Sequence, residues 1–274
     1  GVINKSKMLM ALRLMKAEDQ KALTKEQLST ITKEDITKVF AEGKRKKLKL
    51  EVNVSELSVA LDELNELVGM DNVKTEIDEL VRLIKYYNDI GKDVLNKFSL
   101  HTVFTGNPGT GKTTVARILG KIYKALGILE RGHTVEVDRE TLVAGFIGQT
   151  AIKTQQKIEE ALGGVLFIDE AYALADSGST NDFGKEAIEV ILKRMEDLRG
   201  QFVVFAAGYT DNMNTFLTSN PGLNSRFDKK LHFEDYTQDE MMKIAMHYFA
   251  KEDMVVTQEA KDHLQNYFTD LYKN

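Results

Sequence analysis

Eight consecutive residues, 106–113, fit the phosphate-binding loop pattern G-x-x-x-x-G-K-[ST] in full. Glycines let such a loop curl so that successive N–H groups point at phosphate oxygens. Its lysine reaches the β- and γ-phosphates, and the hydroxyl that follows ligates Mg²⁺. A glycine-rich turn that fits by chance is the alternative, and it is disfavoured by the strand-like run before the loop and the helical run after it. We therefore predict that a nucleotide and Mg²⁺ bind here, with Lys112 on the phosphates and Thr113 on the metal, at a site formed by Gly106, Asn107, Pro108, Gly109, Thr110, Gly111, Lys112, Thr113 and Thr114.

Two carboxylates, Asp169 and Glu170, end an apolar run at residues 164–168. In a parallel sheet, the carboxyl ends of the strands border the ligand crevice. We predict that Asp169 holds Mg²⁺ through water and that Glu170 polarises the attacking water. An isolated strand that ends in Asp-Glu is more often a solvated strand end. Downstream of a phosphate loop, we favour the catalytic interpretation.

The elements that must position these groups alternate along the chain. Strand-like apolar runs occur at residues 100–105, 134–137, 165–169, 202–207 and 230–233, and helical patterns occur at 114–126, 151–162, 184–198 and 211–219. Continuous apolar strands separated by helices indicate a parallel sheet that is covered on both faces. From Thr237 the pattern is purely helical, and it opens with a capping box that ends at Glu240. We predict an α/β phosphate-loop fold followed by a helical segment.

Composition excludes several classes of protein. The 274 residues include 42% hydrophobic and 29% charged residues, which is typical of a globular domain with a core. No apolar run approaches the ~18 residues of a membrane helix. The chain has no cysteine, and its five histidines lie apart from one another, so we expect neither disulfides nor a transition-metal site. We expect a cytoplasmic protein without a membrane partner.

Residues 1–50 differ from the rest of the chain. They carry 13 Lys and Arg against 6 Asp and Glu, a net charge of +7, so the remainder carries −12. The basic run at residues 44–49 is consistent with contact to nucleic acid or an acidic partner, and more often such a run is a solvated linker. Nucleic acid is an unlikely partner of the acidic body, because a groove for it needs phosphate-neutralising charge. Because the sequence begins at Gly1 rather than Met, we expect a fragment of a longer protein.

Five motifs occur in order and together resemble the CbxX/CfqX group of AAA+ ATPases, which includes red-type rubisco activase. They are the phosphate loop, residues 135–138, residues 145–150, Asp169-Glu170 and residues 220–227, and the resemblance covers about residues 55–270. It implies a five-stranded sheet with the phosphate-loop strand central, a helical lid, and a ring, usually a hexamer, with ATP between subunits. We expect three parts: a helical segment and basic linker at 1–50, an ATPase domain at 51–236, and a lid at 237–274.

The resemblance also assigns roles to single residues. Val68 and Gly69, with Met70, match the stretch that packs near adenine. Arg226 matches the arginine that one subunit supplies in trans to its neighbour's γ-phosphate, and the alternative is a surface arginine in an ordinary ion pair. Phe146, Ile147 and Gly148 match the pore loop that grips polypeptide, and the alternative is a packed core turn, since Phe and Ile are mostly buried.

Two departures from the group's pattern stand out. Tyr209 lies where many relatives carry a polar sensor such as Asn, and its hydroxyl is a candidate substitute. The lid's second, nucleotide-sensing arginine is missing before Asn274, so we expect an incomplete lid. We predict an ATP-hydrolysing motor that remodels a protein substrate through a ring pore. The alternatives are a nucleotide-dependent switch or assembly factor that threads nothing and, less favoured, a DNA loader or helicase.

Overall fold

The computed structural model describes residues 50–97, 99–146, 148–175 and 183–271, together with Ile31. Predictions for the rest, which include the helices and basic run of the N-terminal segment and the pore-loop residue Ile147, lie outside the described residues. The chain divides into two compact units, residues 1–49 with 91–93, and residues 50–90 with 94–274. Only the second unit is described below, and the three-part division stays a prediction.

Five parallel strands form one sheet in the order β2-β3-β4-β1-β5. The predicted five-stranded parallel sheet is therefore confirmed. The strand before the phosphate loop, β1, lies between β4 and β5. It is therefore interior but not central, although the resemblance implied a central strand, and β4 occupies the middle of the sheet. The strands are β1 (Thr102–Gly106), β2 (Thr134–Val137), β3 (Val165–Ile168), β4 (Val203–Gly208) and β5 (Lys229–Phe233).

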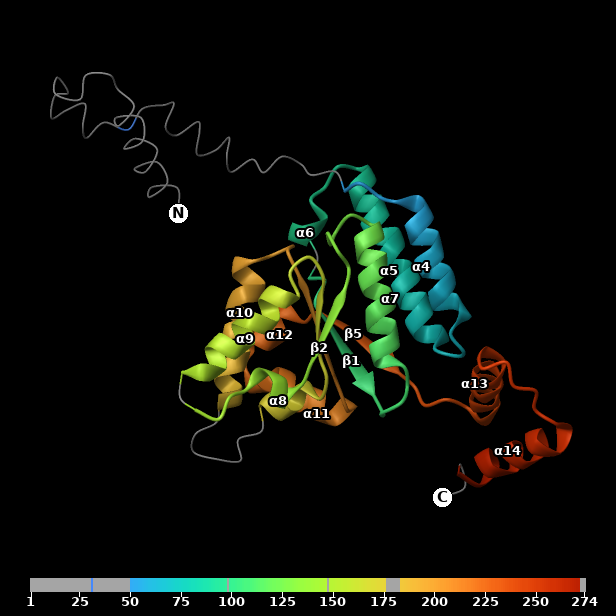
Figure 1. The fold of residues 1–274 in the computed structure, drawn as a ribbon. Helices are drawn as coiled ribbons and strands as arrows, with labels where there is room; N and C mark the ends of the chain where they lie inside the picture. The colour runs from blue at the N-terminus through green and yellow to red at the C-terminus, as the bar shows by residue number, and fades with distance from the viewer. Residues whose placement is uncertain (1–30, 32–49, 98, 147, 176–182, 272–274) are drawn as a thin grey trace. The chain divides into compact units, whose positions relative to one another are not determined.

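Helices cover both faces of the sheet, as the continuous apolar strands predicted (Figure 1). One face carries α4, α5, α6 and α7, and the other carries η2 and α8 to α12. The helices described are α4 (Val54–Glu66), α5 (Asp71–Asp89), α6 (Val94–Lys97), α7 (Lys112–Ala125), α8 (Arg139–Leu142), α9 (Gln149–Glu160), α10 (Phe183–Asp197), α11 (Thr210–Ser219), α12 (Pro221–Arg226), α13 (Gln238–Lys251), α14 (Gln258–Leu271) and the 3₁₀ helix η2 (Ala171–Leu174).

Strand β3 shows why the sheet has two cores. Successive side chains of a strand point to opposite faces. Val165 and Phe167 accordingly pack with α4, α5 and α7, whereas Leu166 and Ile168 pack with the helices of the other face. All four side chains are buried. An apolar run with no polar alternation is therefore what this position in the sheet requires.

Helix α7 approaches the chain just before β2 very closely. A Cβ atom placed on Gly120 would lie 2.7 Å from the backbone oxygen of Gly132, and one on Gly132 would lie 2.6 Å from the oxygen of Gly120. Because neither residue has a side chain, α7 packs directly onto this turn. The contact fixes the helix that begins at the phosphate loop against the sheet.

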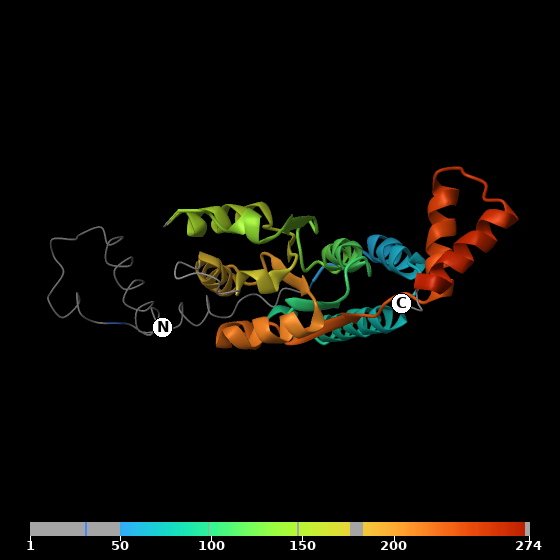
Figure 2. The same cartoon turned by 90° about the horizontal axis from the view of Figure 1, so that it is seen from below.

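Helices α13 and α14 pack against each other and bury no side chain fully. In Figure 2 they are the red pair at the C-terminal end of the chain. The predicted capping box is present, because the Thr237 hydroxyl accepts from the Glu240 N–H at 3.3 Å and the Glu240 carboxylate accepts from the Thr237 N–H at 2.7 Å. Among the described residues, no helix is long and apolar enough to cross a membrane.

Candidate nucleotide site

The phosphate loop joins the end of β1 to the start of α7, as predicted. Two of its glycines have a structural reason, which is a close backbone contact at Gly106 and a left-handed backbone at Gly111. A Cβ atom on Gly106 would lie 2.3 Å from the backbone oxygen of Phe233, and one on Gly111, where φ is +88°, would lie 2.5 Å from the Met70 Cε atom. A side chain at either position would displace the loop. The first N–H groups of α7 consequently stay open to an anion.

Lys112 is buried inside the loop. Its Nζ donates to the backbone oxygens of Gly106 at 3.0 Å and Asn107 at 2.6 Å. Burial lowers the pKa of Lys112, and the negative charges of Asp169 and Asp235 oppose that effect. A phosphate that binds in the loop would add negative charge beside Lys112, and this charge would favour the protonated form of the lysine.

The structure brings the two halves of the predicted site to one cavity of about 330 Å³. Asp169 follows β3 directly, and its N–H donates to the Val137 oxygen at 2.8 Å, which ties this strand end to β2. Glu170 comes next, in the left-handed region at φ +46°. The cavity is lined by Gly106, Pro108, Gly109, Gly111, Lys112, Thr113, Thr114, Asp169, Glu170, Gly208 and Tyr209.

The residues present fit Mg²⁺ with a nucleotide. Within the described part of the chain, no group of three or more His, Cys, Asp or Glu side chains could hold a metal alone. Mg²⁺ in phosphoryl-transfer sites takes one or two protein ligands and fills its other positions with phosphate oxygens and water. Thr113 and Asp169 line the same cavity, where the Thr113 hydroxyl would be a direct ligand and the Asp169 carboxylate would act through water.

Tyrosines occupy the position of the expected polar sensor. Tyr209 follows β4, lines the cavity, and is 38% exposed. The ring of Tyr172, on η2, lies 6.1 Å from it, centroid to centroid. Burial and the Glu170 carboxylate raise the pKa of Tyr172. Gly208 makes room for this ring, because a Cβ atom there would lie 2.7 Å from Tyr172 Cδ1.

Sequence reasoning missed Tyr172 and a second set of contacts behind the loop. The Asn107 side chain donates to both Asp235 carboxylate oxygens, at 2.9 and 2.8 Å, and the Tyr236 hydroxyl donates to the Thr110 oxygen at 3.4 Å. Asp235 and Tyr236 connect β5 to α13. Asp235 and Tyr236 lie two and three residues after β5, whose sequence is mixed polar and apolar, and this position matches no motif.

The predicted adenine-side residues lie next to the loop but outside the cavity lining. Val68 and Gly69 are partly buried, and Met70 reaches the loop at Gly111. A Cβ atom on Gly69 would lie 2.5 Å from Glu240 Oε1, at the start of α13. This stretch therefore bridges the phosphate loop and the helical pair.

Arg226 lies at the opposite end of β1 from the phosphate loop. Its backbone oxygen accepts a hydrogen bond from Ser99, which precedes β1, and its guanidinium pairs with Glu196 at 2.7 Å. Five residues of strand at roughly 3.3 Å each separate this end from Gly106. The structure does not bring Arg226 to the phosphate cavity of its own chain.

The predicted pore loop has a fixed base and an exposed tip. The Thr150 hydroxyl accepts from the Ala144 N–H at 3.0 Å, and Lys153 Nζ donates to the Val143 oxygen at 2.9 Å. Gly148, with φ +78°, starts α9. The Phe146 side chain is 72% exposed, which argues against the packed core turn.

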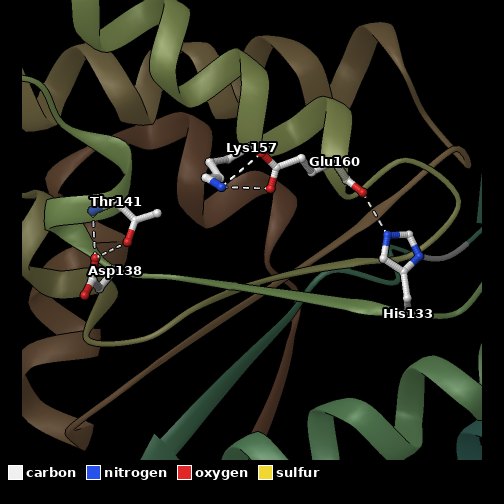
Figure 3. A network of polar contacts seen from close by, with 5 residues as sticks. All are labelled: His133, Asp138, Thr141, Lys157 and Glu160. Atoms are coloured by element: carbon white, nitrogen blue, oxygen red, sulfur yellow. Dashed lines mark hydrogen bonds and ion pairs between the residues drawn. The ribbon is translucent and has the colours of Figure 1, made fainter.

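A polar network holds the elements on either side of this loop (Figure 3). Asp138 directly follows β2. It accepts from the Thr141 hydroxyl at 2.6 Å and from the Thr141 N–H at 2.7 Å, and these two hydrogen bonds, the first more than the second, lower the pKa of Asp138 and cap the start of α8. At the start of β2, His133 Nε2 lies 2.8 Å from the Glu160 oxygen, and Lys157 pairs with the Glu160 side chain at 2.8 Å. Both ends of β2 therefore anchor α8 and α9.

Comparison with known proteins connects this geometry to a family. Residues 102–235 match the family described as "ATPase family associated with various cellular activities (AAA)". The chain is 44% identical over 207 residues to stage V sporulation protein K of Bacillus subtilis (strain 168), a match that covers 75% of this chain and 64% of that protein. It is 43% identical over 218 residues to the chloroplastic ribulose bisphosphate carboxylase/oxygenase activase of Cyanidioschyzon merolae, covering 78% and 74%.

One further relative and one solved structure agree with this family. Protein CbbX of Cereibacter sphaeroides is 42% identical over 223 residues, covering 80% of this chain and 72% of that protein. The solved structure of the FIGL-1 AAA domain in complex with ADP has a TM-score of 0.53 at 18% identity, covering 73% of this chain and 65% of the other. At that identity the likeness extends to the fold alone.

Proposed function

Since this chain belongs to the AAA family of ATP-hydrolysing enzymes, we propose that it couples hydrolysis to the remodelling of a protein substrate gripped in the pore of a ring. The group is the one that the sequence motifs predicted, with CbbX and rubisco activase among the relatives. The observation that carries the remodelling proposal is the exposed Phe146 on a loop whose base is fixed. We place the protein in the cytoplasm, as its lack of cysteine suggests.

Hydrolysis uses the cavity at the end of β1. Lys112 binds the β- and γ-phosphates, and Thr113 and Asp169 hold Mg²⁺, which when bound neutralises charge that develops on the phosphates. Glu170 polarises the attacking water. All four side chains belong to residues that line one cavity, which supports these roles.

Arg226 completes the site of a neighbouring chain. It lies at the far end of β1 from its own phosphate loop, and an arginine supplied in trans can contribute ~10³–10⁵ in rate in related phosphoryl transfer. A closed ring gives every chain such a neighbour. We propose a hexamer, as in the group that the motifs resemble.

Phe146 grips the substrate. A large apolar ring on an exposed tip can bind unfolded polypeptide without sequence preference, and its full burial contributes roughly 1.5–3 kcal/mol. In a ring, several such tips would face one chain of substrate.

The test is Phe146→Ala, with Ile152→Ala as the matched control. Ile152 is also exposed, at 62%, and lies on α9 close to the loop in sequence. We expect Phe146→Ala to keep basal ATPase and melting temperature while losing the stimulation of ATPase by casein, a polypeptide without stable structure. Ile152→Ala should keep all three properties.

The outcome separates the proposed motor from a nucleotide-dependent switch. Stimulation that survives in Phe146→Ala, or that is absent in the unaltered protein as well, favours the switch. Glu170→Gln with ATP should trap the natural substrate, because nucleotide stays bound and unhydrolysed, and the retained proteins can then be identified.

A further inference from the structure

Arg226 is engaged by partners of its own chain. Its Nη2 donates to Glu196 Oε2 at 2.7 Å, and its Nη1 donates to the Gly222 oxygen at 3.3 Å. Glu196 lies in the last turn of α10, three residues before Arg199, which follows the helix. The guanidinium that the proposed function assigns to a neighbour's phosphate is thus paired with a carboxylate within the chain.

This ion pair borders a cavity of about 280 Å³ at the start of β1 and β4. Arg199, Arg226 and His101 line the same cavity, and Glu196 is the only acidic residue among the described residues that do. Burial and the two arginines lower the pKa of His101 to about 4, so the imidazole is neutral at pH 7. The cavity consequently holds two positive charges and one negative charge.

The pair can be displaced by another anion. The Glu196 side chain is 75% exposed and that of Arg226 is 28% exposed. Exposed ion pairs contribute little because water and salt screen them. A γ-phosphate carries more negative charge than a carboxylate and accepts two parallel hydrogen bonds from a guanidinium. It would also be repelled by a carboxylate that stayed beside Arg226.

We propose that Glu196 is a positioning residue that holds Arg226 within its own chain until the γ-phosphate of a neighbouring chain replaces the carboxylate. The inference rests on the proposed trans role of Arg226. Its consequence is that Glu196 restrains hydrolysis, because the productive contact forms only when the resting pair is broken.

The experiment compares Glu196→Gln with Asp197→Asn in the full chain. Asp197 is the adjacent residue, it is exposed, and its change alters the net charge by the same amount. We expect ATPase to rise about two- to fivefold in Glu196→Gln at low salt, the size of an exposed pair's contribution, and to stay within about 1.5-fold in Asp197→Asn. Melting temperatures establish that both variants fold.

Two further measurements identify the cause. The gain should shrink toward none as NaCl is raised from about 50 to 500 mM, because salt screens the pair in the unaltered protein. It should also vanish when Glu196→Gln is combined with Arg226→Lys, which keeps the charge and loses the paired geometry.

Several results would overturn the inference. These are a rate that falls in Glu196→Gln, an equal gain in Asp197→Asn, or a gain that persists with Arg226→Lys. A failure of the proposed function has another signature, in which Arg226→Ala alone leaves the ATPase rate unchanged. If Glu196→Gln does not fold, Glu196→Asp replaces it in the comparison, because its shorter side chain weakens the ion pair without removing the negative charge.

Discussion

Lys112 and Glu170 line the same cavity and have separable tasks. Lys112→Ala should abolish ATP binding, because it removes the cation that lies inside the phosphate loop. Glu170→Gln should keep binding and lower hydrolysis by roughly 10²–10⁴, the usual contribution of a group that polarises water. Titration with a fluorescent nucleotide and measurement of phosphate release test both. Equal loss of binding in the two variants would mean that Glu170 has a structural role.

His101 makes the stability of the fold depend on pH. Its Nδ1 accepts from the Val204 N–H at 2.9 Å, and its ring makes edge-on contacts with the rings of Phe202 and Phe227. The folded pKa is about 4 against 6.5 for the unfolded chain, so below pH 6.5 the unfolded state binds a proton that the folded state does not. The contribution of the neutral His101 to the free energy of unfolding is therefore fully present above pH 6.5 and is lost as the pH falls toward 4.

The expected loss is about 1–3 kcal/mol of unfolding free energy between pH 7 and pH 4.5, discounted for partial exposure of the ring. Urea unfolding at several pH values measures it. His101→Gln, which keeps an acceptor for the Val204 N–H, should show a shallower pH dependence. Parallel pH profiles for the two proteins would contradict this assignment.

At the residue scale, the sequence predicted groups that belong to a motif and missed groups that only folding brings together. The phosphate loop, Asp169 and Glu170 have types and spacings that fit a known chemistry, and they do line one cavity. Tyr172 and Asp235 carry no such pattern. Their roles depend on where η2 and the end of β5 lie relative to the loop.

At the element scale, Gly120 tests how closely α7 packs against the sheet. Gly120→Ala would gain about 1 kcal/mol of helix propensity. Its Cβ atom would lie 2.7 Å from a backbone oxygen, and overpacking costs about 1–3 kcal/mol. The oxygen belongs to a backbone that cannot move freely, so we expect the cost to exceed the gain, with a net loss of up to about 2 kcal/mol in the free energy of unfolding measured with urea.

Gly145→Ala is the matched control for that prediction. A Cβ atom on Gly145 meets no atom within 4 Å, so this substitution should leave the free energy of unfolding nearly unchanged. A Gly120→Ala protein as stable as the control would show that α7 can shift away from the turn at Gly132.

All five strands were predicted to within two residues at their ends, and continuous apolar runs mark β1, β3 and β4, whereas β2 and β5 at the edges of the sheet contain polar residues. Burial of both faces produces such runs, and β3 and β4 have it along their whole length. Short elements were not predicted. Helix α8 and the turn η2 have four residues each, and they depend on single contacts such as that of Asp138 with Thr141.

At the scale of the whole molecule, mixing two inactive variants tests whether Arg226 acts in trans. Arg226→Ala and Lys112→Ala chains should each be inactive alone. In a 1:1 mixture, roughly a quarter of the interfaces would join an intact loop to an intact arginine, so activity should return to that extent. ATPase in the unaltered protein should also rise with protein concentration more steeply than linearly.

A mixture that stays inactive would contradict the trans role of Arg226. If mixed assemblies form, as two distinguishable tags would show, and activity stays absent, then Arg226 serves its own chain. The sequence could predict this role only by resemblance, because no pattern within one chain records the position of a neighbour.

The separation of Arg226 from the phosphate loop along β1 has a genetic consequence. With the proposed ring, a substitution at Arg226 leaves the altered polypeptide able to bind ATP and disables the polypeptide beside it. A mutant allele of this kind would be dominant, because altered product enters assemblies made with the normal allele. A substitution such as Lys112→Ala disables only the site of its own polypeptide, so it would be less harmful when expressed at the same level. A polypeptide with both substitutions would inactivate two sites, its own and that of its neighbour.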